Sequence, residues 1–295
     1  MTFDAERFRH LLGFEERTAD PVAAEIEDKG DFLIERLRLR LGGEEVRGFL
    51  TRPAGAAGRL PAILYGHSHG GLFSMGAREL LDGREYLLDP LGPVFARAGY
   101  VTLAIDMPVF GERARENEGF AAKAALWHSR PLFGRMLSDH GGALTYLAGR
   151  DDVDATRIGA FGISMGSLLS CWLSAIDERI AAVAHLCAFA DLRTMIALGK
   201  HDGHGIYLTV PGLLNEADGG SIAALIAPRP QLVCVGEADA LTPMPAVERA
   251  LADLRPAYAA APGRLELISE PGVGHRETAR MRAGVMAFFA RWLQG

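Results

Sequence analysis

The sequence predicts an α/β fold, in which a mostly parallel sheet of about eight strands starts with an N-terminal antiparallel hairpin and carries helices on both faces. The first observation is a set of six short, continuously apolar segments, which is typical of strands buried on both faces of a parallel sheet. The second is that helix-like segments separate them, as in alternating β and α units. The apolar segments are residues 62–65, 101–105, 158–163, 180–186, 232–235 and 265–268, and the helix-like ones are 93–98, 141–147, 168–175, 245–254 and 278–293.

The residues ahead of these strands show a different pattern. Apolar and charged residues nearly alternate in residues 34–41 and again in 45–51, and Gly42-Gly43 separates the two runs. Alternation on both sides of a glycine pair predicts the antiparallel hairpin. Residues 1–30 are polar, and we expect them to form a helical extension outside the sheet.

The remaining features predict a single domain over residues 1–295. The chain contains no internal repeat, low-complexity tract or linker. Two irregular stretches, 107–140 and 190–217, follow predicted strands, and loops in such positions often control access to a pocket. We therefore expect both stretches to cover a pocket.

Composition narrows the classes of function. The chain is 49% hydrophobic and 23% charged, which is ordinary for a soluble globular enzyme. A net charge of −6 without any basic block argues against nucleic acid as a partner. The first twenty residues contain no apolar signal core, and no stretch has the ~18 apolar residues of a membrane span. We expect a cytoplasmic protein without a membrane partner, and a homo-oligomer stays open.

The three cysteines, Cys171, Cys187 and Cys234, lie in apolar stretches without C-x-x-C spacing. We expect them to be small core residues in a reducing compartment, and neither disulfide partners, metal ligands nor nucleophiles.

The clearest motif is Gly162-Ile163-Ser164-Met165-Gly166, a G-x-S-x-G pattern between a predicted strand and a predicted helix. A serine on so tight a turn has a strained backbone and an exposed hydroxyl, and the helix that follows brings unpaired N–H groups and a partial positive charge. A chance match is the alternative in a chain with 35 glycines, but the strand and helix on either side are the confirming context. The motif predicts that Ser164 is a catalytic nucleophile.

A catalytic acid is expected after the nucleophile, at the carboxyl end of a strand. Asp239 follows the strand 232–235, and it is our candidate. Glu237 is a competitor two residues earlier, and Asp191, after the preceding strand, is in reserve. Asp106 ends an earlier strand but precedes the serine, so we expect a structural role in which it accepts hydrogen bonds from the backbone or from Arg113.

The base is predicted to be His275, in a loop between the last strand and the last helix. This histidine follows Gly274 directly. An unperturbed pKa of ~6.5 makes imidazole suitable for general base catalysis near pH 7. A solvent-exposed loop histidine without a catalytic role is the alternative.

An oxyanion hole is predicted from the N–H of Met165 and one N–H of the loop 66–71, where Ser68 and His69 are both candidates. A metal site at His67 and His69, or at His201 and His204, is less favoured because no further ligand has suitable spacing.

These motifs together resemble the α/β-hydrolase superfamily over nearly the whole chain from Phe32, and within it the dienelactone-hydrolase and acetyl-xylan-esterase-like branch. Ser164 stands where true dienelactone hydrolases have a cysteine. The resemblance implies hydrolysis of a carboxylic ester of a small molecule by a Ser-His-Asp triad through an acyl-enzyme, without a cofactor. The matching pieces are residues 66–71, 106–111, 162–166, 227–230, 236–239 and 274–275.

Three alternatives stay open at this point. The same triad could serve a prolyl-oligopeptidase-like peptidase or amidase, or an acyltransferase or lyase. The third is a binding protein of the same fold without catalytic activity, against which the complete set of three residues argues.

Overall fold

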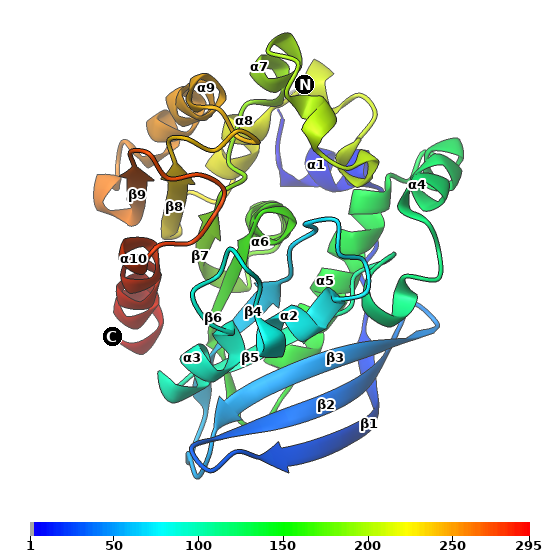
Figure 1. Ribbon diagram of the computed structural model, residues 1–295, viewed down its shortest axis with the longest axis vertical. Helices are drawn as coiled ribbons and strands as arrows, with labels where there is room; N and C mark the ends of the chain where they lie inside the picture. Colours follow the sequence, from blue (N-terminus) through cyan, green and yellow to red (C-terminus); the bar gives the residue numbers. More distant parts are fainter. Residues whose placement is uncertain (1–2) are drawn as a thin grey trace.

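The computed structural model describes residues 3–295, and its central feature is one twisted sheet of nine strands among these residues (Figure 1). The strand order is β1-β2-β3-β5-β4-β6-β7-β8-β9. The strands are β1 (Ala19–Asp28), β2 (Phe32–Leu41), β3 (Glu44–Pro53), β4 (Leu60–Gly66), β5 (Val101–Ile105), β6 (Val153–Ile163), β7 (Ile180–Leu186), β8 (Gln231–Gly236) and β9 (Leu265–Glu270).

The six segments predicted as strands all form strands, β4 to β9, and the strands β5-β4-β6-β7-β8-β9 pair in parallel. The prediction of burial on both faces is wrong for β9, because this strand lies at the edge of the sheet and none of its residues is fully buried. Every residue of β5 and of β8 is buried. The predicted hairpin is also present, because β2 and β3 pair antiparallel, and β3 joins the parallel strands through an antiparallel pairing with β5.

The prediction for residues 1–30 is wrong in its second half. Only α1 (Ala5–Leu12) is helical, and β1 pairs antiparallel with β2 as an edge strand. The sheet therefore has nine strands instead of about eight. Along β1 only Ala19 is buried, so buried and exposed side chains do not alternate as they do in a half-buried strand. The strand conformation of β1 depends instead on backbone pairing with β2.

Helices cover both faces of the sheet, and an apolar cluster lies under each set. The cluster on one face includes residues of α1, α5, α6, α8 and α9, and the cluster on the other includes residues of α3 and α10. The predicted helical segments correspond to α3, α5, α6, α9 and α10. The helices after α1 are α2 (Glu79–Asp82), α3 (Leu91–Arg97), α4 (Glu118–Trp127), α5 (Leu132–Ala148), α6 (Met165–Ile176), α7 (Leu192–Ala197), α8 (Gly219–Ala224), α9 (Met244–Leu254) and α10 (Ala279–Phe289).

The sheet contains a topological switch point between β4 and β6. From β4 the chain moves to β5 on one side, and it then returns to β6 on the other side. Loops that leave the carboxyl ends of two such strands diverge, and ligands of open α/β sheets bind in the crevice between them. The loop 66–71 and Ser164 follow these two strands.

The two stretches expected to cover a pocket contact each other. The stretch 107–140 contains α4 and the start of α5, and 190–217 contains α7 and the 3-10 turn Ile206–Leu208, which contacts α4. Their role as a pocket cover stays a prediction. Within the described residues, no helix is both long and apolar enough to cross a membrane.

Candidate active site

Ser164 lies on a strained turn between β6 and α6, as the motif predicts. Its φ of 58° and ψ of −125° are unusual for a residue with a side chain. The main-chain N–H of Ser164 donates to the carbonyl oxygen of Leu186, 2.9 Å away at the end of β7. The turn therefore holds the serine, which is half-buried, at the carboxyl ends of the parallel strands.

The glycines around Ser164 permit close packing that any side chain would prevent. A Cβ atom on Gly162 would lie 2.4 Å from the backbone of Gly166, and one on Gly166 would lie 1.9 Å from the carbonyl oxygen of Gly66. Gly66 begins the loop that was predicted to carry an oxyanion N–H. The contact between Gly66 and Gly166 brings this loop against the first turn of α6.

His275 and Asp239 form a hydrogen-bonded pair. The distance from His275 Nδ1 to Asp239 Oδ2 is 2.7 Å. Asp239 also accepts from the N–H of Leu241 at 2.9 Å and from the hydroxyl of Thr242 at 2.7 Å. Because Nδ1 faces the carboxylate, Nε2 is the ring nitrogen left for proton transfer. The structure thus brings together the predicted acid and base.

The surroundings of Asp239 keep it ionised. Burial acts to raise the pKa of this carboxyl, but the hydrogen bonds from His275, Thr242 and Leu241 outweigh it, and the pKa lies below its usual value. The side chain of Asp239 is buried, whereas His275 is only partly buried. An ionised Asp239 can hold the imidazole in one orientation and stabilise its protonated form.

The two competing acids have other partners. Glu237 accepts a hydrogen bond from Ser269 Oγ at 2.8 Å, and Asp191 caps α7 by accepting the N–H of Thr194 at 2.7 Å. Neither of them is hydrogen-bonded to His275. Asp239 is the acid that the structure places at the histidine.

Asp106 holds a loop together, as expected. Its carboxylate accepts the N–H groups of Ala77 at 2.8 Å and Glu112 at 2.9 Å, and it pairs with Arg47. Arg113 donates to the main-chain oxygen of Asp106 at 3.1 Å, so this contact does not involve the carboxylate.

The oxyanion candidate Ser68 is excluded by its hydrogen bonds. Its main-chain N–H donates to Glu79 Oε1 at 2.9 Å, and its hydroxyl also contacts Glu79. An N–H engaged by a buried carboxylate is not free to bind a substrate oxygen. Of the two loop candidates this leaves His69, and the other proposed donor, Met165, is the first residue of α6.

Sequence reasoning missed Glu79, which is fully buried behind this loop. Besides Ser68, its carboxylate accepts the hydroxyl of Tyr65 at 2.7 Å and lies 3.4 Å from the guanidinium of Arg84. The Tyr86 hydroxyl lies 2.6 Å from Ser68 Oγ, and the Tyr86 ring packs edge-on against the ring of His275. Burial raises the pKa of Tyr86 to about 12, so its hydroxyl stays protonated, and Tyr86 links the loop to His275.

A second histidine–carboxylate pair, also missed, lies on the loop itself. His69 Nε2 is 2.6 Å from Glu118 Oε2, and the N–H of Gly71 donates to His69 Nδ1 at 3.1 Å. The other oxygen of Glu118 accepts the N–H of Tyr207 at 3.1 Å. No local motif in the sequence marks Glu118, because these partners come from distant parts of the chain.

The other histidines do not form a metal site. Buried His67 donates from Nδ1 to the Ser68 oxygen and accepts the N–H of Met107 on Nε2, so both nitrogens are occupied, and burial lowers its pKa. His204 contacts the Leu241 oxygen at 2.9 Å, and His201 is exposed. Among the described residues, neither the pair His67 and His69 nor the pair His201 and His204 therefore supports the hypothesis of a metal site.

All three cysteines are buried free thiols, as predicted. Burial raises the pKa of Cys171 and of Cys187 to about 12, which leaves them protonated. The Cys187 sulfur lies near the His275–Asp239 pair, within 4.8 Å of their ligand atoms.

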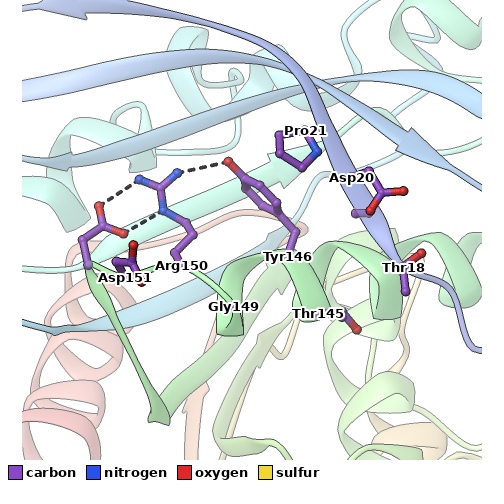
Figure 2. Close-up of a pocket in the computed structure, with 10 residues that line it drawn as sticks. Thr18, Asp20, Pro21, Thr145, Tyr146, Gly149, Arg150 and Asp151 are labelled. Carbon is purple, nitrogen blue, oxygen red and sulfur yellow. Dashed lines mark hydrogen bonds and ion pairs between the residues drawn. The ribbon is translucent and has the colours of Figure 1, made fainter.

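A large cavity of about 710 Å³ lies away from this chemistry. It is bounded by β1 and the end of α5, and it includes Arg150, which donates to the Tyr146 hydroxyl at 3.1 Å (Figure 2). Arg150 is also paired with Glu35 and Asp152. Asp152 precedes β6 whereas Ser164 follows it, so the length of the strand, roughly 30 Å, separates the cavity from the serine.

Two other cavities lie next to each other, and one of them includes residues close in sequence to Ser164 and Asp239. A small one of about 20 Å³ has Ser167 and Leu168 of α6 and Thr242 in its wall. A mainly apolar one of about 530 Å³ lies within the stretch 190–217. The two share three wall residues, Leu192, His204 and Leu208.

Comparison of the sequence with known proteins identifies the family. The sequence model of the prolyl oligopeptidase family matches residues 93–295, more than half of the chain. "Putative hydrolase YtaP" of Bacillus subtilis (strain 168) is 36% identical over 280 residues, which cover 92% of this chain and 93% of that protein. The chain therefore belongs to the prolyl oligopeptidase family, within the α/β-hydrolases.

Solved structures confirm the α/β-hydrolase fold. Methylesterase BT1017 is similar with a TM-score of 0.73 and 22% identity, over 97% of this chain and 62% of its own. The acetyl xylan esterase of Paenibacillus sp. R4 has a TM-score of 0.69 and 19% identity, over 98% of this chain and 93% of its own. The chain thus spans about three fifths of the methylesterase but nearly all of the acetyl xylan esterase.

Proposed function

We propose that this protein is a serine hydrolase that cleaves a carboxylic ester of a small molecule. The observation that carries the proposal is the 2.7 Å hydrogen bond between His275 and buried Asp239, at the same end of the sheet as the strained Ser164. Membership of a hydrolase family supports the class of reaction. Esterases among the proteins of similar fold, one a methylesterase and one an acetyl xylan esterase, support an ester as the substrate.

In the proposed mechanism, His275 Nε2 removes the hydroxyl proton of Ser164 while Oγ attacks the ester carbonyl. The tetrahedral oxyanion accepts hydrogen bonds from the N–H groups of Met165 and His69. The protonated His275, stabilised by Asp239, gives its proton to the departing alcohol, and an acyl-enzyme remains. Water then loses a proton to His275 and attacks the acyl group, which regenerates Ser164 and releases the acid. No cofactor takes part.

A fluorophosphonate probe tests the nucleophile. We expect the wild-type protein to be labelled and Ser164→Ala not to be labelled, because the probe reacts with an activated serine hydroxyl. Ser167→Ala, three residues away on α6, is the matched control and should keep its labelling. Equal labelling of wild type and Ser164→Ala, seen by mass spectrometry of the intact protein, would overturn the proposal.

A peptidase or amidase is the second candidate, and membership of the prolyl oligopeptidase family favours it. Hydrolysis of chromogenic acyl esters is compared with hydrolysis of chromogenic aminoacyl amides to distinguish an esterase from a peptidase. A kcat/KM that is larger for the aminoacyl amides would replace the esterase by a peptidase on the same residues. An acyltransferase on these residues would form product only when an acceptor alcohol or amine is added.

A further inference from the structure

Glu118 joins three separate segments around the candidate oxyanion loop. It is the first residue of α4, and its side chain is only 9% exposed. One carboxylate oxygen lies 2.6 Å from Nε2 of His69 in the loop 66–71, and the other accepts the N–H of Tyr207 in the stretch 190–217. Gly205 packs so closely that a Cβ there would lie 2.5 Å from Glu118 Oε1.

The His69 ring is held in one orientation. Its neighbours are Phe73 and Phe110, with ring centroids 5.1 Å away, and Tyr207, which stacks at 5.3 Å. Because the N–H of Gly71 donates to Nδ1, this nitrogen carries a lone pair, and the ring proton is on Nε2. His69 therefore donates to Glu118.

Only a carboxylate can satisfy both partners of this position. The partners are two donors, the Nε2–H of His69 and the N–H of Tyr207, so two acceptor oxygens are required. A glutamine of the same shape offers one acceptor and one donor, and one of the two hydrogen bonds must break whichever way its amide is turned. Burial acts to raise the pKa of Glu118, but the hydrogen bond from His69 outweighs it and the net pKa is lowered, which favours the ionised form.

We propose that Glu118 is a positioning residue, which fixes the main-chain N–H of His69 for the oxyanion by holding the His69 ring against Tyr207. The inference rests on the proposed function, since it concerns the same reaction. An oxyanion donor binds the transition state and not the ground state, so its displacement lowers kcat and leaves KM nearly unchanged. A residue that merely stabilised the fold would produce no such selective effect on kcat.

The first test compares Glu118→Gln with Glu116→Gln. Glu116 lies two residues earlier and pairs with Arg135 on the surface, so it is the matched control for the same chemical change. For an ester substrate we expect Glu118→Gln to lower kcat about tenfold to a hundredfold, less than complete loss of an oxyanion donor, with KM within about threefold. Glu116→Gln should match wild type. An unchanged kcat in Glu118→Gln would overturn the inference.

Two further variants exclude a general folding defect. Glu118→Asp keeps both acceptor oxygens, and we expect it to recover part of the kcat lost in Glu118→Gln. If Glu118 acts through the His69 ring, then Glu118→Gln should change kcat less than about twofold in a His69→Ala background. An equal fall of kcat in both backgrounds would show that Glu118 does not act through His69.

Failure of the inference and failure of the proposed function give different results. If wild type has no esterase activity and Ser164→Ala keeps its fluorophosphonate labelling, the proposed function fails. If wild type is an active, Ser164-dependent esterase and Glu118→Gln keeps the wild-type kcat, only the role of Glu118 fails.

Discussion

Two histidine–carboxylate pairs have their histidines at the same end of the sheet as Ser164, after the carboxyl ends of β4 and β9, and they use their rings in opposite ways. His275 turns Nδ1 toward Asp239, at 2.7 Å, and His69 turns Nε2 toward Glu118, at 2.6 Å. The Nδ1 of His69 is occupied by the N–H of Gly71. Both carboxylates are largely buried, and both have a lowered pKa.

The difference shows that a histidine–carboxylate pair does not by itself make a base. With Nδ1 engaged, His275 keeps Nε2 free, whereas His69 has both ring nitrogens engaged, stacks on Tyr207 and packs edge-on against Phe73 and Phe110. In our proposals the same chemical pair serves catalysis in one place and positioning in another. Which of the two roles it takes depends on the partner of the second nitrogen.

Removal of the proposed base should have the largest effect on activity. We expect His275→Ala to lower kcat by about 10⁵-fold to 10⁶-fold, because the variant lacks the group proposed to take the Ser164 proton. Steady-state hydrolysis of an ester after purification of both proteins measures this effect. If the kcat of His275→Ala were no lower than the kcat of His69→Ala, the two pairs would not have the different roles proposed for them.

Changing the carboxylate of the first pair should have the next largest effect. Asp239→Asn presents an amide to His275 Nδ1, which favours the wrong tautomer, and we expect kcat to fall by about 10⁴-fold. Asp191→Asn, in the acid that caps α7, is the control and should keep kcat close to wild type. Comparable losses in the two variants would reopen the choice of the catalytic acid.

A third histidine, His140, differs from both pairs because neither of its ring nitrogens has a hydrogen-bond partner among the described residues. Burial lowers its pKa to about 3, against about 6.5 in an unfolded chain. Below pH 6.5 the unfolded chain binds a proton that the folded protein does not, so this histidine reduces stability as pH falls toward 3. At pH 5 the free energy of unfolding should be lower by about 2 kcal/mol because of His140.

Urea unfolding at pH 7 and pH 5 measures this contribution. We expect His140→Leu to lose less stability between the two pH values than wild type, by about 2 kcal/mol. The exposed His128, replaced in the same way, should behave like wild type. The same pH dependence in His140→Leu and wild type would contradict the assignment.

The parts that the sequence predicts well are those whose signal is local. Strands β4 to β9 are predicted from runs of mostly apolar residues, and all of them except the edge strand β9 are largely buried. Ser164, Asp239 and His275 follow such strands, and the order of the chain restricts the choice among competing acids. For these elements a few neighbouring residues contain the necessary information.

The parts that the sequence does not predict depend on contacts between distant segments. In β1 the side chains of Val22 and Ile26 are exposed, 42% and 62%, so the strand exists through its pairing with β2. Glu118 lies 49 residues from His69 and 89 from Tyr207. The engagement of the Ser68 N–H by Glu79 likewise becomes visible only when the chain is folded.

The backbone angle of Ser164 also has a thermodynamic consequence. With φ at 58°, the residue occupies a conformation that suits glycine and opposes any side chain, at about 1–3 kcal/mol. An alanine at this position keeps that strain, whereas a glycine removes it. Replacement of the proposed nucleophile by glycine should therefore relieve this strain, so stability and the proposed activity favour different residues at position 164.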